Sequence, residues 1–543
     1  MVRIFSAVPG GANSRTRGLF GSTQGASTLP PSNFRNTLDL LPLTTVCRLW
    51  RDILLNSPAL WTSLSSADPR WGASSSFFSE PERALHISRL RPGMTSARPL
   101  YIVSAEPIQD SGNSHFFREN GHRIEELTVT MHLYGTMWCP APNGSQHSPP
   151  FHSLSFPPTS LKRLTLTGQA RLDYGTVWQN IPLFDGVELA INSLFMHSIP
   201  FLPVNPTPFL TCLVLSWSLY DNIPRTGGPV RELLTFLSNT PSLQKAYIDG
   251  VTEDVEGTSV TQIVHLPFLR TLKLSPGRAA ATVFSQLSLP PQCLTFLNRI
   301  DIRSGDCVAA VSTAIPLHTH RGAAKLYCSW DPGYFQGSVG SISIQAIWPE
   351  DGGGLRLHLA SQQQGEDLTD ACDALDVLLS ALAGVDEVWL RGAGSEMFVA
   401  RAAPQMLLRR CTAVKALHVH AIVPFGRESV PALWPPAHVW PALERLHVCL
   451  NGTEGLQDLA GLLRARKDAG RRVEELRVSH QARAEAAREV EAIRGATEAH
   501  VGNVEVGWNL YEQGSWDTVL PRIVLPAESN VFWPSWVGDT VFG

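Results

Sequence analysis

A six-residue pattern with hydrophobic residues at its first, fourth and sixth positions recurs toward the C-terminal end of the chain at nearly constant intervals. Its five most regular copies begin 29, 29, 30 and 28 residues apart, at Val385, Val414, Leu443, Val473 and Val501. Hydrophobic residues make up 43% of the sequence, so a single match arises by chance at about 8% of positions. Even spacing does not arise in this way, and it predicts a structural unit that is repeated along the chain.

Further copies of the pattern extend the series toward the N-terminus. Four of them begin 33, 26 and 28 residues apart, at Leu210, Leu243, Leu269 and Leu297. Weaker candidates bridge the gap to the regular copies at Ala323 and Gly354, and less evenly spaced ones begin at Ile124, Leu161 and Phe184. Each match predicts a short β-strand, because its fourth and sixth residues point to the same side of an extended chain.

Helical patterns lie between these strands. Residues 367–382 place six apolar residues on one helical face, and Gly384 stands where a left-handed C-cap is expected. Similar patterns cover 230–238, 397–410 and 455–466. A single strand–turn–helix unit cannot bury its apolar face, so such units must stack. The predicted fold class is therefore α/β: a leucine-rich-repeat-like solenoid with parallel strands on its concave side and helices on its convex side.

We expect this solenoid to be irregular. Leucine-rich repeats place an Asn eight residues after the first hydrophobic residue, and in the five regular copies that position is Asn only at Asn451 and Asn509. Long insertions are expected at 134–160, 303–320 and 423–440. Residues 510–543 carry Trp516, Trp533 and Trp536 among Gly and Pro residues. We expect this last segment to cover the final unit as a cap.

The residue between the last two hydrophobic positions of each unit should point to the concave surface. From Leu269 onward this column reads Lys273, Asp301, Tyr327, His358, Trp389, His418, His447, Arg477 and Glu505. Because Trp, Tyr and Arg dominate protein-binding hot spots, we predict that a protein target contacts Tyr327, His358, Trp389, Arg391, His418, His447 and Arg477. An ordinary solvated sheet is the alternative, and an exposed Trp389 is the residue that it explains least well.

Two neighbouring units also bring potential metal ligands to matching positions. His418 and His420 occupy the same places in one unit as His447 and Cys449 in the next. Adjacent strands lie about 4.8 Å apart, so the four side chains could form a zinc site. The local ligand spacing of zinc motifs is absent, however, and a flat parallel sheet disfavours tetrahedral geometry. We therefore predict no metal and no cofactor, and we assign no catalytic residue because the common phosphate-binding, metalloprotease and serine-hydrolase motifs are absent.

Segment 39–64 reads DLLPLTTVCRLWRDILLNSPALWTSL, with apolar residues spaced for one face of a helix that Ser57-Pro58 ends. It resembles the second half of an F-box, in which a Leu-rich turn leads into V-C-x-x-W-R and closes with S-P-x-L-W. The likeness is greatest to fungal F-box proteins, in which the motif is followed by an R-P-L-x-hydrophobic strand, here 98–102, and by leucine-rich repeats. The residues that match the motif are Leu41, Leu43, Val46, Cys47, Trp50, Arg51, Pro58, Leu60 and Trp61.

The resemblance implies that this segment binds the Skp-type adaptor of a cullin ubiquitin ligase through Leu41, Leu43, Val46, Cys47, Trp50, Leu60 and Trp61. The chain departs from the family upstream, where Leu29-Pro30-Pro31 is followed by SNFRNT and not by the L-P-x-E-L-L helix. We predict the substrate-recognition (F-box) subunit of a Skp–cullin-type ubiquitin ligase, which binds a protein target on its concave face. A stand-alone interaction scaffold without ligase coupling is the alternative.

The predicted layout is a tail (1–35), a partial F-box (36–68), a helical and strand connector (69–120), the repeats (121–509) and a cap or tail (510–543). Lys and Arg number 44 against 48 Asp and Glu, and this slight negative charge argues against a nucleic-acid partner. No run approaches the ~18 apolar residues of a membrane span. Nine scattered cysteines without a CxxC pair favour a reducing compartment, so we expect a cytoplasmic or nuclear protein.

Overall fold

A computed structural model of the protein describes part of its 543 residues. The described residues are 47–49, 52, 63–65, 99–104, 117, 120–134, 154, 156–171, 179–197, 199, 201–217, 228–252, 263–275, 277–301, 305–318, 324–331, 341–348, 352–360, 384–392, 411–421, 440–450, 456–480 and 486–508. The chain divides into two compact units. Unit 1 comprises Met1–Asp254 and Ile523–Phe542, and unit 2 comprises Val255–Arg522 with Gly543.

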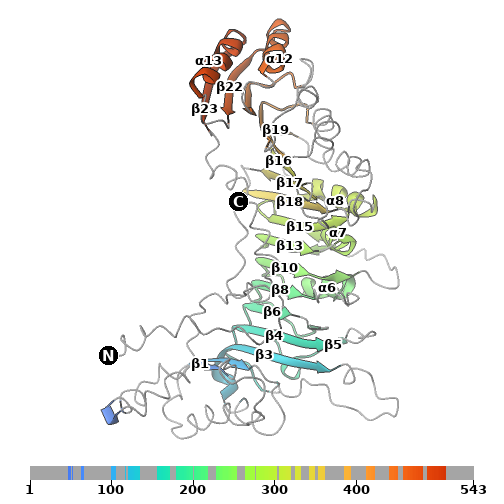
Figure 1. Ribbon diagram of the computed structural model, residues 1–543. Helices are drawn as coiled ribbons and strands as arrows, with labels where there is room; N and C mark the ends of the chain where they lie inside the picture. The colour runs from blue at the N-terminus through green and yellow to red at the C-terminus, as the bar shows by residue number, and fades with distance from the viewer. Residues whose placement is uncertain are drawn as a thin grey trace. The chain divides into compact units, whose positions relative to one another are not determined.

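Unit 1 is built on a parallel sheet whose described strands pair in the order in which they follow along the chain (Figure 1). These strands are β1 (Ser63–Ser65), β2 (Leu100–Ser104), β3 (Ile124–Tyr134), β4 (Arg163–Arg171), β6 (Ser193–His197), β8 (Cys212–Ser216) and β10 (Lys245–Asp249). Smaller parallel pairs join β5 (Gln179–Ile181) to β7 (Phe201–Pro203) and β9 (Gly228–Pro229) to β11 (Val251–Thr252). The described helical elements are α6 (Val230–Ser238), η4 (Gly121–Arg123) and η6 (Phe184–Gly186).

One face of this sheet contributes the core of unit 1, and we refer to it as the inner face. Its most regular row, with every member at most 1% exposed, consists of Leu127, Leu164, Leu194, Leu213 and Ala246. Alternate residues point to the opposite or outer face, where the matching row consists of Thr128, Thr165, Phe195, Val214 and Tyr247. Slipping any strand by one residue would turn its leucines outward, so burial of the inner row specifies the register.

Unit 2 has the same inner-face pattern in a longer described sheet. In spatial order its strands are β13 (Thr271–Ser275), β15 (Leu294–Asp301), β18 (Gly353–Ala360), β17 (Ser341–Trp348), β16 (Ala324–Asp331), β19 (Val385–Gly392), β20 (Ala416–Ala421), β21 (Arg445–Leu450), β22 (Val473–His480) and β23 (Val501–Trp508). β12 (Val264–His265) pairs separately with β14 (Leu287–Ser288). The helical elements are α7 (Gly277–Ser285), α8 (Gly305–His318), α12 (Leu456–Asp468), α13 (Ala486–Thr497) and η7 (Glu498–His500).

The five regular copies of the sequence pattern form consecutive parallel strands, β19 to β23, as predicted. Their fourth positions stand in a single row on the inner face, made of Val388, Leu417, Leu446, Leu476 and Val504. The α/β class and the mainly parallel pairing are therefore confirmed.

The prediction of uniformly parallel strands is wrong in the middle of unit 2. There β16, β17 and β18 form an antiparallel meander, so that β18 pairs with β15 and β16 pairs with β19. The link from β17 to β18 spans only residues 349–352, and Gly352 adopts a positive φ of 70° within it. A parallel connection needs a crossover of about a dozen residues. Because this link is much shorter, β17 and β18 must pair in antiparallel orientation.

Three predicted repeat positions are also displaced. Phe184 opens no strand: it lies in the turn η6 with a φ of 48°, and the next strand of the sheet is β6. The residues that stand on the inner face beside Leu272 are Thr295 and Leu355. Relative to this observed pairing, the copy predicted to begin at Leu297 is shifted by five residues and the copy predicted to begin at Gly354 by two. Apolar residues at every second position permit several such alignments, and only strand pairing distinguishes them.

Several helix predictions and layout boundaries can be compared with the described elements. α6 matches the prediction over 230–238 and α12 the one over 455–466, while 367–382 and 397–410 lie outside the described residues. The expected insertion at 303–320 contains α8, and β1 and β2 extend the sheet of unit 1 before residue 121.

In the part of the chain that the structure describes, no helix combines the length and apolarity needed to cross a membrane.

Candidate functional site

The outer face of unit 2 carries a row of side chains that continues through the ten described strands of its large sheet, and we refer to it as the central row. In spatial order it consists of Lys273, Phe296, Arg356, Gln345, Tyr327, Trp389, His418, His447, Arg477 and Glu505. Aromatic rings, imidazoles and guanidinium groups thus stand side by side on a hydrogen-bonded support. Such a composition is typical of protein-binding surfaces.

Most of the residues predicted to contact a target belong to this row. They are Tyr327, Trp389, His418, His447 and Arg477, from β16, β19, β20, β21 and β22. The remaining two, His358 and Arg391, lie one step further along their strands, where they pair with Ser343 and Ser329 respectively; the side chain of Arg391 lies outside the described residues. The predicted and observed alignments of the strand that carries His358 differ by two residues. Because alternate residues of a strand point to the same face, His358 is still on the outer face.

Sequence reasoning missed the members of the central row that the meander contributes. Phe296 and Arg356 stand where Asp301 and His358 were predicted, and Gln345 comes from the unpredicted strand β17. Asp301 itself stands opposite Ala360. β15 also contains a bulge between Leu297 and Ile300, beyond its member of the central row.

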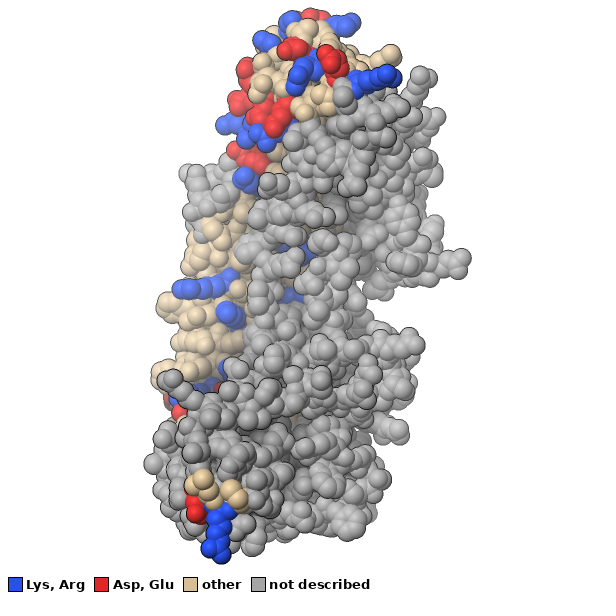
Figure 2. Space-filling model, turned by 60° about the vertical axis from the view of Figure 1, so that its left-hand side comes forward, with Lys and Arg blue, Asp and Glu red and all other residues tan. Residues whose placement is uncertain are grey.

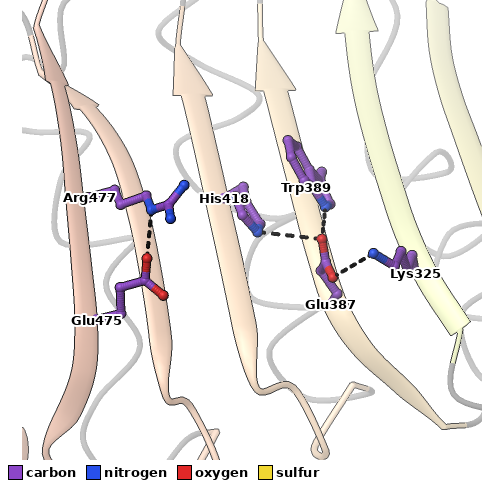
Figure 3. A network of polar contacts seen from close by, with 6 residues as sticks. All are labelled: Lys325, Glu387, Trp389, His418, Glu475 and Arg477. Atoms are coloured by element: carbon purple, nitrogen blue, oxygen red, sulfur yellow. Dashed lines mark hydrogen bonds and ion pairs between the residues drawn. The ribbon is translucent and has the colours of Figure 1, made fainter. Parts of the chain in front are cut away.

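A buried carboxylate organises the middle of the outer face (Figure 3). Glu387, two residues before Trp389 on β19, has a side chain that is 11% exposed. Its Oε2 lies 3.0 Å from Nζ of Lys325 on β16, and its Oε1 accepts a 2.7 Å hydrogen bond from Nε1 of Trp389. The sequence gives no signal for this contact, because Lys325 and Glu387 are 62 positions apart and meet only through the pairing of β16 with β19.

Aromatic stacking continues from Trp389 to the next two strands. The Trp389 indole lies on the imidazole of His418, with ring centroids 3.8 Å apart and planes 8° apart. His447 meets His418 edge-on at 5.7 Å, and its Nε2 lies 3.0 Å from Oγ of Ser479. Trp389, expected to be exposed, is therefore half-buried and held in place by both Glu387 and His418.

Burial sets the charge states in this cluster. It lowers the pKa of His418 to about 4, and nearby positive charges act in the same direction while Glu387 opposes them. His418 is therefore neutral at pH 7, and its Nε2, 3.5 Å from Oε1 of Glu387, makes a long polar contact and not an ion pair. Burial alone would raise the pKa of Glu387, but hydrogen bonds from Lys325 and Trp389 outweigh it and hold that pKa below its usual value.

Arg477 is the most accessible cation of the central row. Its Nε donates to Oε1 of Glu475 at 2.6 Å and lies 3.1 Å from Oε2 of Glu505, while 51% of the side chain is exposed. Both contacts use Nε, which orients the guanidinium group and leaves much of it open to solvent. Acidic and basic side chains alternate over this end of unit 2 (Figure 2).

The other end of the row is less accessible than a bare sheet would be. Tyr327 is 7% exposed, and Lys273 and Phe296 are each 4% exposed. His447, although it stands beside Arg477, is also only 7% exposed. Lys273 Nζ and the Arg356 guanidinium lie 4.6 and 4.9 Å from the centre of the Phe296 ring, within the range of cation–π contacts. The accessible part of the row is therefore its C-terminal end, on β22 and β23.

A second row, on the outer face of unit 1, brings together residue types that also occur in hydrolases. His197, Ser216 and Asp249 stand opposite one another on β6, β8 and β10. The serine lies between the other two, whereas a catalytic triad needs the histidine in the middle. Ser216 is also only 1% exposed. This arrangement does not support nucleophilic catalysis.

Within the described residues, no three or more His, Cys, Asp or Glu side chains converge on a position that could hold a metal ion. The side chains of His420 and Cys449, two of the four conceivable zinc ligands, lie outside the described residues.

Of the residues predicted to bind an adaptor, Cys47 is described and is exposed. Leu49, close to it in the chain, is 60% exposed. The others, namely Leu41, Leu43, Val46, Trp50, Leu60 and Trp61, lie outside the described residues.

Comparisons with known proteins do not assign the chain to a family. No protein-family model matches its sequence, and no curated protein is significantly similar to it.

Proposed function

We propose that this protein is the substrate-recognition (F-box) subunit of a Skp–cullin-type ubiquitin ligase. In this proposal the strand–turn–helix units are an irregular leucine-rich-repeat-like solenoid, and the outer face is its concave, target-binding side. Support comes from the F-box-like sequence of 39–64 and from the regular spacing of the strands behind it. The single observation that carries target binding is the central row, which holds Trp389, His418 and Arg477 in register on successive strands.

The proposed mechanism is non-enzymatic. The N-terminal segment would tether the chain to the adaptor, and the outer face would hold a protein target beside the ubiquitin-conjugating enzyme. Tethering converts an encounter between two proteins into one within a complex, at an effective concentration of about millimolar for short flexible connections. Selectivity would then depend on the side chains of the central row and not on the fold.

A stand-alone interaction scaffold is the second candidate. One observation favours it: the L-P-x-E-L-L helix that supplies much of the family's adaptor contact has no counterpart before residue 39. Under this alternative the central row binds the same kind of partner, but no ligase is recruited.

Affinity purification with two matched variants separates these possibilities. Trp50→Ala with Trp61→Ala should abolish recovery of the Skp-type adaptor and leave other partners bound. Trp389→Ala with Arg477→Glu should do the reverse, because these residues lie on the outer face of unit 2. If the unaltered full-length chain recovers partners through the central row but no adaptor, the scaffold is the correct alternative. If neither variant changes what is recovered, both candidates fail.

A further inference from the structure

β23 is an edge strand within the described part of unit 2. It pairs with β22 on one side, and no described strand lies on its other side (Figure 1). A strand inside a sheet directs its backbone N–H and C=O groups toward two neighbours, whereas an edge strand has one set of these groups left over. A further extended polypeptide satisfies that set completely. The chemistry of this edge therefore selects another strand as its occupant.

The side chains of β23 are more accessible than those of the strand beside it. Val504 and Val506 continue the inner face and are half-buried, whereas the residues opposite them on β22 are fully buried. Asn503 and Glu505 stand on the outer face and are exposed, with 49% of the Glu505 side chain accessible. The sheet thus ends in a strand with apolar surface that one more strand would cover.

The sequence of β23 is complementary to itself in antiparallel orientation. Residues 502–506 read GNVEV. If two copies pair about a two-fold axis at Val504, each Val506 stands opposite Gly502 of the second copy and each Glu505 opposite Asn503 of the second copy. A branched side chain then faces a residue that has none, and a carboxylate faces an amide that can donate a hydrogen bond to it.

The charge of Glu505 selects this register. A charged residue on an edge strand ordinarily prevents pairing with another strand. Here Nε of Arg477 lies 3.1 Å from Oε2 of Glu505 and compensates its charge within one copy. In the register centred on Val504 no like charges stand directly opposite each other. A slip of two residues, which would centre the pair on Glu505, would bring the two carboxylates face to face.

We propose that two copies of this chain associate through β23, in antiparallel orientation about a two-fold axis at Val504. The two sheets of unit 2 then continue into each other, with their outer faces on the same side. A single pair of strands buries less than the roughly 1,200 Å² of a stable interface, so we expect a reversible dimer with a Kd of about 10 μM. The dimer does not depend on the proposed function. If the central row binds targets, however, the dimer presents two such rows on one side.

Sedimentation equilibrium of the full-length protein, with variants at Asn503, measures the association. Asn503→Glu places like charges opposite each other in two symmetry-related pairs and should raise the Kd about tenfold, whereas Asn503→Lys places opposite charges there and should lower it about fivefold. The exposed Gln457 on α12 provides matched controls. Gln457→Glu and Gln457→Lys make the same changes in net charge and should leave the Kd unchanged.

Disulfide formation tests the register. In full-length protein with Val504→Cys, oxidation by copper phenanthroline should join the two introduced thiols, which mass spectrometry identifies, because this residue stands opposite itself. Val506→Cys is the matched control on the same face. Its two copies would lie about 13 Å apart along the strands, too far for a disulfide.

Three results would overturn the proposal. A full-length chain that stays monomeric at about 100 μM would leave the edge to a strand of another protein. A Kd that neither substitution at Asn503 changes would place the contact between the copies elsewhere. A disulfide from Val506→Cys but not from Val504→Cys would show another register. Neither measurement involves the adaptor or a target, so the proposed function can fail independently.

Discussion

The inner faces of the two units are alike in composition, whereas their outer faces differ. On the inner side both present rows of fully buried aliphatic residues, such as Leu194 and Leu213 in unit 1 and Leu417 and Leu446 in unit 2. On the outer side, the row of unit 1 is uncharged and ends in a buried apolar cluster, whereas the row of unit 2 contains rings and charges. The comparison separates two roles: the inner rows stabilise the fold, and in the proposed function the outer row of unit 2 binds the target.

The largest effects should come from the inner rows and should be alike in both units. Leu213→Ala and Leu446→Ala each remove a fully buried side chain and should lower the free energy of unfolding by about 2–5 kcal/mol. Urea denaturation followed by circular dichroism measures the loss, and hydrogen exchange locates it within one unit. Phe209→Ala, at a residue that is 56% exposed, should cost less than about 0.5 kcal/mol. A large cost in one unit alone would break the comparison.

Acid should weaken both units in the same pH range, because each contains a histidine that burial keeps neutral. The pKa of His197 in unit 1 and of His418 in unit 2 is lowered to about 4. In the unfolded chain each titrates near 6.5, so the unfolded state takes up a proton first as the pH falls. Stability is therefore complete above pH 6.5 and falls progressively toward pH 4, by at most about 3 kcal/mol per histidine.

Substitution of each histidine by Gln checks this sign. Hydrogen exchange measured between pH 7 and pH 4 should show a shallower loss of protection in unit 1 for His197→Gln and in unit 2 for His418→Gln. A slope that neither substitution changes would assign the acid sensitivity to other groups.

The buried carboxylate Glu387 of unit 2 can be compared with the more exposed carboxylate Glu126 of unit 1. Glu387→Gln removes the charge that Lys325 faces and weakens the bond from Trp389, and should cost about 1–2 kcal/mol. Glu126→Gln breaks a 3.4 Å pair with Arg163 in which both side chains are more than a third exposed, and should cost less than about 1 kcal/mol. Equal costs in urea denaturation would contradict the difference in burial between these two pairs.

The smallest effect on stability should come from the most accessible cation. Arg477→Gln removes contacts with Glu475 and Glu505 but should change the free energy of unfolding by less than about 1 kcal/mol, because the side chain is half-exposed. Any difference should shrink as NaCl is raised from 0.05 to about 1 M, since salt screens exposed pairs. A change in partner recovery without a change in stability would identify Arg477 as a binding residue. A loss above 2 kcal/mol would identify it as a structural one.

The sequence by itself determined the last five strands, the faces of their side chains and the order in which they pair. The two-residue alternation of apolar side chains decides which residues can be buried together, and the near-constant interval indicates neighbours that pair in sequence. From this alone Trp389, His418, His447 and Arg477 could be aligned, and the structure places them opposite one another.

Only the tertiary structure decided the alignment in the middle of unit 2. A slip of two residues leaves every side chain on the same face, so local alternation cannot distinguish Arg356 from His358 as the member of the central row. Nor can it reveal that Lys325 lies beside Glu387, because that contact depends on which strands become neighbours. The accessibility of an outer-face side chain likewise depends on its neighbours in the folded protein: Trp389 is half-buried, between Glu387 on its own strand and His418 on the next.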